Sequence, residues 1–402
     1  MRIKSILLIG VLLTCSALAW ETKKVQVAEE LDVLQLTNKF LKFDIGIGSG
    51  AYHYKDDASN VFYTITDRGP NIKCKDSKKL LDIKVCEKGK IFPVANFTPT
   101  IYKIKLFKNY YKVLQKIQIK DRDGNHVSGV SNQNTENAYN IKGEKIPFDA
   151  QGIDPEALVK LSDGTFWIGE EYGASLLHVS KDGRILKRVV PSGFEANIKN
   201  ANYEISSSLP QIISKRPLNR GIESIAISQD ENFLYFSMQS PLANPDKKAY
   251  KSSNIVRMFK YNIKEDKITA EYLYKLDKAT SFSLDSKKKQ NGVKISEMVC
   301  IGNDEFIILE RMTKTTKFYK VKFKNSVLDS KWDDIATSPS LEQSSNVKQI
   351  MNKELVLDTS TLENMPKKIE GIAYVDENHW ILINDNDFGI YKDKTYIVEL
   401  KK

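Results

Sequence analysis

The stretch EALVKLSDGTFWIGEEYG, residues 156–173, decides the fold, because its pattern returns several times along the chain. It opens on a glutamate, continues as a short apolar run, turns on Ser-Asp-Gly and returns as a second run rich in aromatic residues. Two such runs around a polar turn are typical of a β-hairpin. The second run ends on Glu170 and Glu171, so the hairpin is expected to carry carboxylates at one end.

Four other segments follow the same plan. Residues 370–387 (EGIAYVDENHWILINDND) also open on glutamate and end on carboxylates, and residues 223–240 (ESIAISQDENFLYFSMQS) have Gln239 near the end. Residues 297–311 (EMVCIGNDEFIILER) are a shorter copy, and residues 49–69 (SGAYHYKDDASNVFYTITDRG) lack the opening glutamate but end on Asp-Arg-Gly. Self-similarity of this kind indicates a repeat architecture.

The repeat predicts an all-β protein, a β-propeller built from four-stranded blades, in one domain over residues 20–402. Six blades are expected, because the interval from 50 to 156 is long enough for one extra blade. A parallel α/β fold is disfavoured, since amphipathic helical stretches between the strands are nearly absent. We expect the circle to close by pairing of the N-terminal run 33–45 with the C-terminal run 395–400.

The N-terminus predicts a signal peptide over residues 1–19. Two cations precede an apolar run of about ten residues, and Ala-Leu-Ala then leads to Trp20. The sequence LLTC permits lipid attachment at Cys15 as an alternative. No later segment approaches the roughly 20 apolar residues of a transmembrane helix. The mature protein is therefore expected to be exported, to the periplasm or the medium, without a membrane span.

The cysteines, the histidines and the net charge indicate which kinds of site and ligand the protein could have. Cys74 and Cys86 bound a short loop, and an oxidising compartment predicts a disulfide between them, whereas Cys300 is expected to be a buried free thiol. The histidines are scattered singly and fit no zinc site. The formal net charge of +10 comes from lysines spread along the chain, which indicates a lysine-rich surface or, as the functional alternative, attraction for small anionic ligands. No nucleic-acid-binding motif is present.

The carboxylates at the hairpin ends are expected to meet at one mouth of the propeller. In an antiparallel hairpin the first residue of one strand lies near the last residue of the other. The expected neighbours are Glu156 and Glu171, Glu223 and Gln239, Glu297 and Glu310, and Glu370 and Asp385, with Asp67 from the outlying copy. Because blades repeat around an axis, these groups should share one end of it.

Two interpretations of this acidic set remain open. In one, the carboxylates cap loop amides or pair with arginines and fix contacts between blades. In the other, they hold one or more hard cations, with Ca²⁺ the natural choice outside the cell. Three arginines close to these carboxylates in sequence could then grip a phosphate or carboxylate substrate. These expected substrate-binding residues are Arg68, Arg220 and Arg311.

The chain also resembles a known family at these residues. Its segments YTITDRGPN (63–71), IDPEALVKLSDGTFWIGEEYG (153–173), NRGIESIAIS (219–228), ISEMVCIGNDEFIILER (295–311) and IEGIAYV (369–375) are similar to the phytase-like family described by esterase-like activity of phytase. The resemblance implies hydrolysis of phosphoric or carboxylic esters by a propeller-like domain with recurring acidic positions. Within GEEYG it assigns the acidic position to Glu171 rather than Glu170. Ala157 and Ser224 depart from the family's glycine.

The expected function is therefore metal-assisted hydrolysis of a phosphate ester by an exported enzyme. The expected Ca²⁺ ligands are Asp67, Glu156, Glu171, Glu310 and Asp385, and the expected catalytic residues are Glu171, Glu223, Glu370, Arg68 and Arg311. A rim carboxylate would act as general base, and the arginines would stabilise charge on the phosphoryl oxygens. One alternative is a lactonase or carboxylic esterase on the same scaffold. Another is a non-catalytic binding or scaffold propeller, because propellers host all three.

Overall fold

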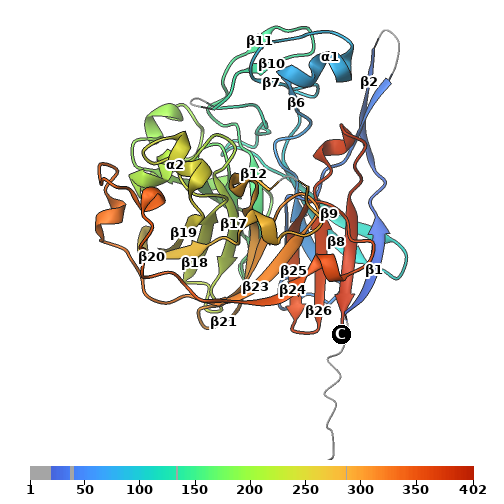
Figure 1. Ribbon diagram of the computed structural model, residues 1–402. Coiled ribbons are helices and arrows are strands. Elements are labelled where there is room, and N and C mark those ends of the chain that lie inside the picture. The colour runs from blue at the N-terminus through green and yellow to red at the C-terminus, as the bar shows by residue number, and fades with distance from the viewer. Residues whose placement is uncertain (1–19, 37–39, 133–134, 287) are drawn as a thin grey trace, which may run out of the picture.

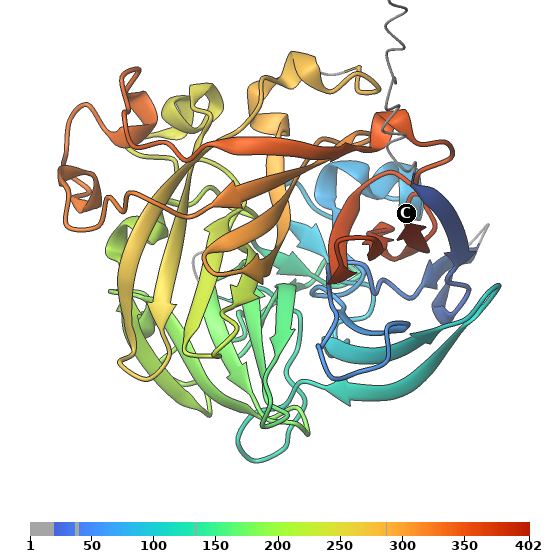
Figure 2. The same cartoon turned by 90° about the horizontal axis from the view of Figure 1, so that it is seen from below.

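Five mainly antiparallel sheets surround one axis in the computed structural model, which describes residues 20–36, 40–132, 135–286 and 288–402 (Figures 1 and 2). The predicted signal peptide, including Cys15, lies outside the described residues. Each sheet is one blade whose first strand lies at the axis. The innermost strands β4, β12, β17, β21 and β25 contact one another in sequence, and β25 contacts β4 again, which closes the circle. The fold is therefore a β-propeller.

The blades are listed here from the axis outward. Blade 1 consists of β4 (Gly50–Tyr52), β5 (Val61–Ile65), β8 (Thr100–Leu106) and β9 (Tyr111–Gln118). Blade 2 consists of β12 (Pro155–Lys160), β13 (Phe166–Glu170), β14 (Ser175–Val179), β15 (Ile185–Pro191) and the parallel strand β16 (Glu204–Leu209). Blade 3 consists of β17 (Ile222–Ile227), β18 (Phe233–Met238), β19 (Ile255–Asn262) and β20 (Lys267–Lys275). Blade 4 consists of β21 (Lys294–Gly302), β22 (Glu305–Arg311), β23 (Thr316–Lys322) and β24 (Lys353–Asp358). Blade 5 consists of β25 (Ile369–Asp376), β26 (His379–Asn384), β27 (Tyr396–Lys401) and β1 (Glu21–Gln26).

The hairpins that open the five blades are those expected from the repeat, but the expectation of six blades is wrong for the described residues. The interval that was to supply the extra blade forms a small sheet outside the circle instead. Its strands are β6 (Ile72–Lys73), β7 (Lys90–Ile91), β10 (Ala138–Tyr139) and β11 (Lys145–Ile146). Residues 119–152 are rich in Gly, Asn, Asp and Ser and offer few side chains for a core, so they form only the two-residue strands β10 and β11. Strands of this length are too short for a blade.

Closure of the circle uses a different N-terminal segment from the one expected. Strand β1 pairs antiparallel with β27, with Glu21 opposite Lys401. The expected segment instead forms a separate hairpin, β2 (Glu30–Gln35) with β3 (Phe40–Asp44). In β1, only Val25 is buried, because an outer strand needs few apolar residues. Its sequence, ETKKVQ, therefore gives little sign of a strand.

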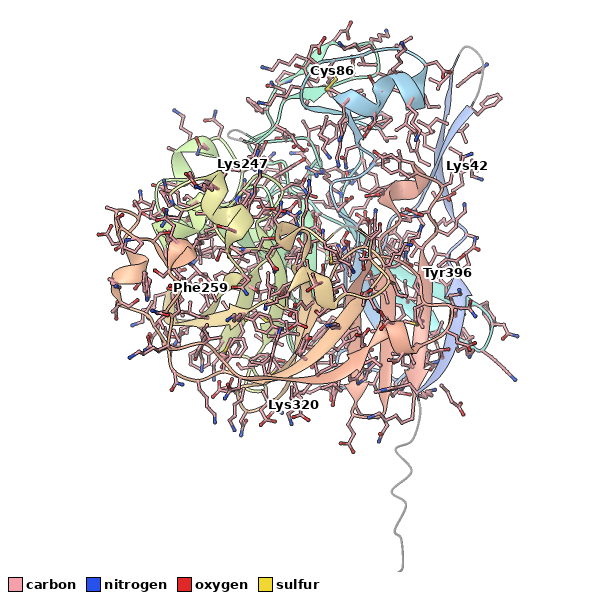
Figure 3. All side chains as sticks on the ribbon, viewed as in Figure 1. Lys42, Cys86, Lys247, Phe259, Lys320 and Tyr396 are labelled. Atoms are coloured by element: carbon pink, nitrogen blue, oxygen red, sulfur yellow. A yellow bond between two sulfur atoms is a disulfide. The ribbon has the colours of Figure 1, made fainter. Side chains whose placement is uncertain are left out.

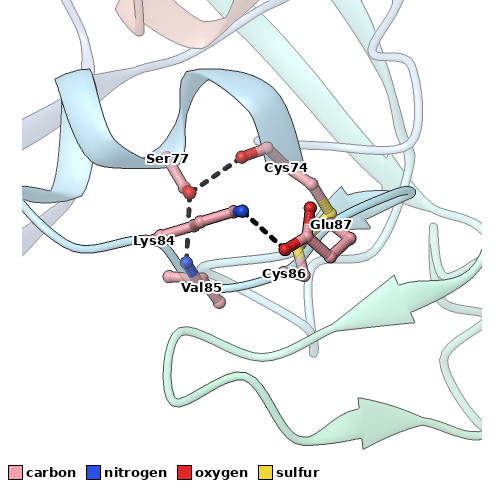
Figure 4. Close-up of a disulfide and its surroundings, with 6 residues drawn as sticks. All are labelled: Cys74, Ser77, Lys84, Val85, Cys86 and Glu87. Carbon is pink, nitrogen blue, oxygen red and sulfur yellow. Dashed lines mark hydrogen bonds and ion pairs between the residues drawn. A yellow bond between two sulfur atoms is a disulfide. The ribbon is translucent and has the colours of Figure 1, made fainter.

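The small sheet, α1 (Ser77–Leu81) and the loops between them form an insertion at one end of the propeller (Figure 1). The predicted disulfide between Cys74 and Cys86 is present in it (Figure 4). Ser77 Oγ donates to the carbonyl oxygen of Cys74 and accepts from the N–H of Val85. These hydrogen bonds connect the disulfide-closed loop to the first residue of α1. A second short helix, α2 (Lys247–Ser252), lies at the same end of the propeller as the insertion.

Removal of the disulfide is expected to loosen the insertion and leave the propeller folded. The bond joins positions 12 residues apart, and closing a loop of this size stabilises by about 3 kcal/mol in the chain-entropy treatment. In a protein lacking residues 1–19, Cys74→Ser/Cys86→Ser should be cleaved faster by protease within residues 72–146. Unfolded wild type without reductant should titrate one thiol, that of Cys300. Three titratable thiols would contradict the bond.

Candidate functional site

The inner strands of four blades each contain one extra residue at the same place. Between Pro155 and Ala157 of β12 the partner strand advances by only one residue, so Glu156 is left without a partner. The same β-bulge occurs in β17, β21 and β25, and the unpaired residues there are Glu223, Ser296 and Glu370. A bulge redirects a side chain away from the regular alternation of the strand. Three of the four bulges therefore present a carboxylate at one end of the axis, which we call the mouth.

The second strand of each blade has one equivalent register position at this end. In order around the propeller it holds Asp67, two residues beyond β5, then Glu171, Gln239, Arg311, which is the last residue of β22, and Asp385. The predicted neighbours in blades 2, 3 and 5 are therefore brought together. Blade 4 differs, because Ser296 rather than Glu297 occupies its bulge, and Arg311 rather than Glu310 occupies its second position.

The mouth opens into a cavity of about 1010 Å³. Among its lining residues are the predicted Asp67, Arg68, Glu156, Arg220, Glu223, Arg311, Glu370 and Asp385. The insertion adds Lys73 and Lys90, and α2 adds Lys247 and Lys251. Figure 3 marks Lys247 on α2 and Cys86 in the insertion, the two elements that border the mouth. A cavity of this size accommodates a small organic substrate.

Three carboxylates at the mouth form a group with the dimensions of a cation site. One oxygen each of Asp154, Glu156 and Glu171 lies within 4.8 Å of the others. Asp154 and Glu171 are fully buried, whereas Glu156 is half-buried. Glu171 Oε2 has no hydrogen-bond donor among the described residues, and its Oε1 accepts only a long bond of 3.4 Å from Gln239 Nε2. Buried carboxylate oxygens normally have donors, so these oxygens are free to bind a ligand.

Asp154 was not predicted from the sequence. It lies two residues before the bulge, and its backbone carbonyl accepts the N–H of Glu171. Its Oδ2 lies 3.2 Å from Nη1 of Arg68, which makes it the acidic partner of that arginine. The segment IDPE contained a signal, because Pro155 holds the acid just before the strand where its side chain can turn toward the mouth.

Burial and mutual repulsion raise the pKa values of these three carboxylates. Burial raises the pKa of Asp154 to about 8, an effect that Arg68 opposes and that the neighbouring glutamates reinforce. Burial and the charge of Glu223 raise the pKa of Glu171 to about 7. The same two causes hold the pKa of Glu156 well above its usual range. Protonation or a bound cation therefore relieves a charge density that the surrounding protein does not neutralise.

The predicted arginines have different partners. Arg68 Nη1 lies 2.9 Å from Glu136 Oε1, and Nη2 donates to Asn219 Oδ1. Arg311 pairs with Glu370 and donates from Nε to Ser296 Oγ at 2.7 Å. Arg220 donates to Gln239 but has no ion pair. Arg68 and Arg311 are thus held in place by carboxylates at the mouth.

Six cations that line the mouth have no anionic partner among the described residues. They are Lys73, Lys90, Arg220, Lys247, Lys251 and Lys294. Burial lowers the pKa of Lys90 to about 8 and that of Lys294 to about 7, in both cases with help from nearby arginines. Unpaired cations beside one cavity are expected to attract anions. Sequence reasoning missed these lysines because they come from four separate elements, β6, β7, α2 and β21, of a lysine-rich chain.

Glu310 was expected among the mouth carboxylates, but the structure places it elsewhere. Its carboxylate accepts from Tyr274 Oη at 2.9 Å and from the N–H of Asp277 at 2.6 Å, and it pairs with Lys353. The reason is the bulge at Ser296, which shifts the hairpin end by one residue and sends alternate side chains to the other face.

Glu170 has a structural role. Its Oε2 lies 2.9 Å from Nη2 of Arg188, and both side chains are fully buried. Its carboxylate also accepts the N–H groups of Tyr172 and Gly173. Within GEEYG, only Glu171 therefore belongs to the mouth.

Comparisons with known proteins agree with this description. A family model described as "Phytase-like: Esterase-like activity of phytase" matches residues 46–388. An uncharacterized secreted protein of Arthroderma benhamiae is 30% identical over 186 residues, which cover 42% of this chain and 35% of that relative. The chain thus matches about a third of that relative's length.

Solved structures with the same kind of fold are similar only at a distance. The β-propeller domain of Cps50 (Swd1) from Myceliophteria thermophila shows a TM-score of 0.37 and 9% identity over 93% of this chain and 99% of that one. Virginiamycin B lyase from Staphylococcus aureus shows a TM-score of 0.32 and 11% identity over 96% and 100%. Among the described residues, no helix has the length and apolar character that would take it across a membrane.

Proposed function

The chain belongs to the phytase-like family, and on that premise we propose that it is an exported hydrolase of phosphate esters that works with bound Ca²⁺. The observation that carries the proposal is the convergence of Asp154, Glu156 and Glu171 at the mouth, where Glu171 Oε2 is buried and has no donor among the described residues. Glu156 lines the mouth cavity, and the family match spans all three residues. The signal-like N-terminus and a secreted relative support export.

The donor set fits a hard cation. All three groups offer carboxylate oxygens, which Ca²⁺ and Mg²⁺ prefer, and no cysteine or histidine is among them. Asp67 and Asp385 line the same cavity and could complete the set, with Ca²⁺ as the common choice outside the cell. A bound cation would neutralise a phosphate oxygen and lower the pKa of a water molecule.

The remaining mouth residues supply positions for a substrate and a base. Glu223 is buried and its Oε2 has no donor, which makes it the candidate general base. Glu370 orients Arg311 through their ion pair, and Asp154 and Glu136 orient Arg68. A guanidinium held in this way can receive phosphoryl oxygens with little reorganisation.

Positive groups lie near the acidic cluster of blade 2. Lys294 begins β21, Arg311 ends β22, and Arg220 lies two residues before β17. A phosphate ester could therefore contact the cation site and positive groups of blades 3 and 4 together. The same arrangement favours a phosphate over a lactone, which carries no charge for these cations to bind.

Assays of ester hydrolysis with Ca²⁺ and with the chelator EDTA test the proposal. Purified protein without residues 1–19 should cleave an aryl phosphate monoester or diester in the presence of Ca²⁺, and EDTA should abolish the activity reversibly. Cleavage of lactones or aryl carboxylic esters alone would favour the esterase alternative. No cleavage of any ester, together with thermal stability that ignores EDTA, would contradict the proposal and leave a binding or scaffold role.

A further inference from the structure

One buried carboxylate beneath the mouth has no part in the proposed chemistry. Glu297 is only 1% exposed, and no cation pairs with it in the portion of the chain that the structure describes. It follows the bulge of blade 4, so its register equivalents in blades 2, 3 and 5 are Ala157, Ser224 and Gly371. Gly50 has the matching place in blade 1. One layer around the axis thus contains four small residues and a single glutamate.

The small residues in this layer let the strands approach closely. A Cβ at Gly50 would lie 2.9 Å from the carbonyl oxygen of Glu156 and 3.1 Å from Oε2 of Glu297. A Cβ at Gly371 would lie 2.7 Å from the nitrogen of Ala51. No larger side chain fits there without displacing backbone. The space left on the axis is occupied by the Glu297 carboxylate.

The contacts of Glu297 join different blades. Its Oε2 accepts the N–H of Ala51 in blade 1 at 3.4 Å, and its Oε1 accepts the N–H of Met298 at 3.1 Å. The N–H of Ile225 in blade 3 faces the same carboxylate. Inner strands have no neighbour on their axial side, so N–H groups there need another acceptor. Glu297 supplies that acceptor to three blades at once.

The layer also divides the channel in two. The mouth cavity is lined by residues that precede the layer, such as Ser49, Glu156 and Glu223. A second cavity of about 260 Å³ at the opposite end is lined by residues that follow the layer, such as Ala51 and Met298. No member of the layer lines either cavity, so Glu297 closes the axis between them.

We infer that Glu297 is a positioning residue for the acidic cluster: it fixes the inner strands of blades 1, 3 and 4, and those of blades 1 and 3 contact β12, the strand that carries Glu156, on either side. The inference rests on the proposed function in so far as that cluster binds Ca²⁺. It assigns no contact with substrate to Glu297. Its consequence is that the spacing of the mouth carboxylates depends on a side chain one layer below them.

The test compares Glu297→Ala and Glu297→Gln with wild type by two independent measurements. Amide hydrogen exchange of residues 50–52, measured without metal, should accelerate at least tenfold in Glu297→Ala, because the acceptor for Ala51 is lost. The Kd for Ca²⁺, measured by calorimetry, should rise at least about tenfold in the same variant. Glu297→Gln retains the shape and one acceptor oxygen, so both effects should be several-fold smaller, and this variant keeps the test open if Glu297→Ala does not fold.

Glu310→Gln is the matched control, because Glu310 is a buried acid of the same hairpin that lies outside the mouth. Its Kd for Ca²⁺ should stay within about twofold of wild type. Unchanged exchange at residues 50–52 in Glu297→Ala would overturn the axial contact. Faster exchange with an unchanged Kd would overturn the positioning role. If wild type binds no Ca²⁺, the proposed function fails, and the exchange rates alone then decide whether Glu297 fixes the inner strands.

Discussion

Glu171→Gln is expected to lower phosphate-ester hydrolysis by at least about 100-fold, since loss of a ligand should cost no less than loss of an outer-sphere partner. Glu171 is buried, one of its oxygens has no donor, and it lies in the group of three carboxylates. An amide at this position has the same shape but no charge. The variant should therefore lose the stabilisation by Ca²⁺ that we expect for wild type, about 2.7 kcal/mol at 100 times Kd. Initial rates and chemical denaturation with and without Ca²⁺ measure both effects.

The same substitution should not destabilise the metal-free protein at pH 8. Burial and Glu223 raise the pKa of Glu171 to about 7, so its charge is unfavourable in the folded state above that pH. Glu310→Gln is the contrasting variant. Lys353 keeps its ion pair with Asp277, so the loss of this partner should cost only about 1 kcal/mol, and the Ca²⁺ response should stay intact. A Glu171→Gln variant with wild-type rates would remove this residue from the site.

The sequence was sufficient to predict the propeller and most of the mouth, because both depend on local patterns. Hairpins such as 156–173 and 370–387 are defined by alternation and turns within a few residues. Their ends were predicted to meet, and Glu156, Glu171, Glu370 and Asp385 do lie at one mouth. The blade count was wrong because the spacing of the hairpins does not show that β6, β7, β10 and β11 are too short for a blade, whereas β8 and β9 belong to blade 1.

The positions of side chains that the sequence did not predict depend on the register of paired strands. A bulge moves the following side chains to opposite faces, and nothing in ISEMVCIG marks Ser296 as the extra residue rather than Glu297. Glu310 was assigned to the mouth for that reason, and the axial place of Glu297 was missed. Asp154 and the unpaired lysines were missed for another reason, since they come from separate parts of the chain whose approach depends on the closed circle.

The stability of the metal-free protein is expected to fall as pH rises from 5 to 7. The folded-state pKa of Asp154 is about 8 and that of Glu171 is about 7, both above their ordinary values of 3.8 and 4.5. Between the ordinary and the raised values the folded state binds more protons than the unfolded state. Linkage then requires that stability, fully present below the ordinary pKa, is lost as pH rises through the raised one. Each proton involved corresponds to about 1.4 kcal/mol per pH unit.

The predicted decline in stability ends near pH 7, because deprotonation of two buried lysines makes stability rise with pH. The pKa of Lys294 is lowered to about 7 and that of Lys90 to about 8, so above these values the unfolded state binds more protons and stability rises with pH. Saturating Ca²⁺ should remove the decline between pH 5 and 7, because the cation replaces the protons of the carboxylates and binds more tightly as they ionise. Urea denaturation at pH 5, 6 and 7, in EDTA and in Ca²⁺, measures both slopes, and Glu171→Gln should show a shallower decline in EDTA than wild type. A metal-free protein that gains stability over this range would show that the mouth carboxylates are ionised and neutralised by protein groups, and that would argue against a cation site there.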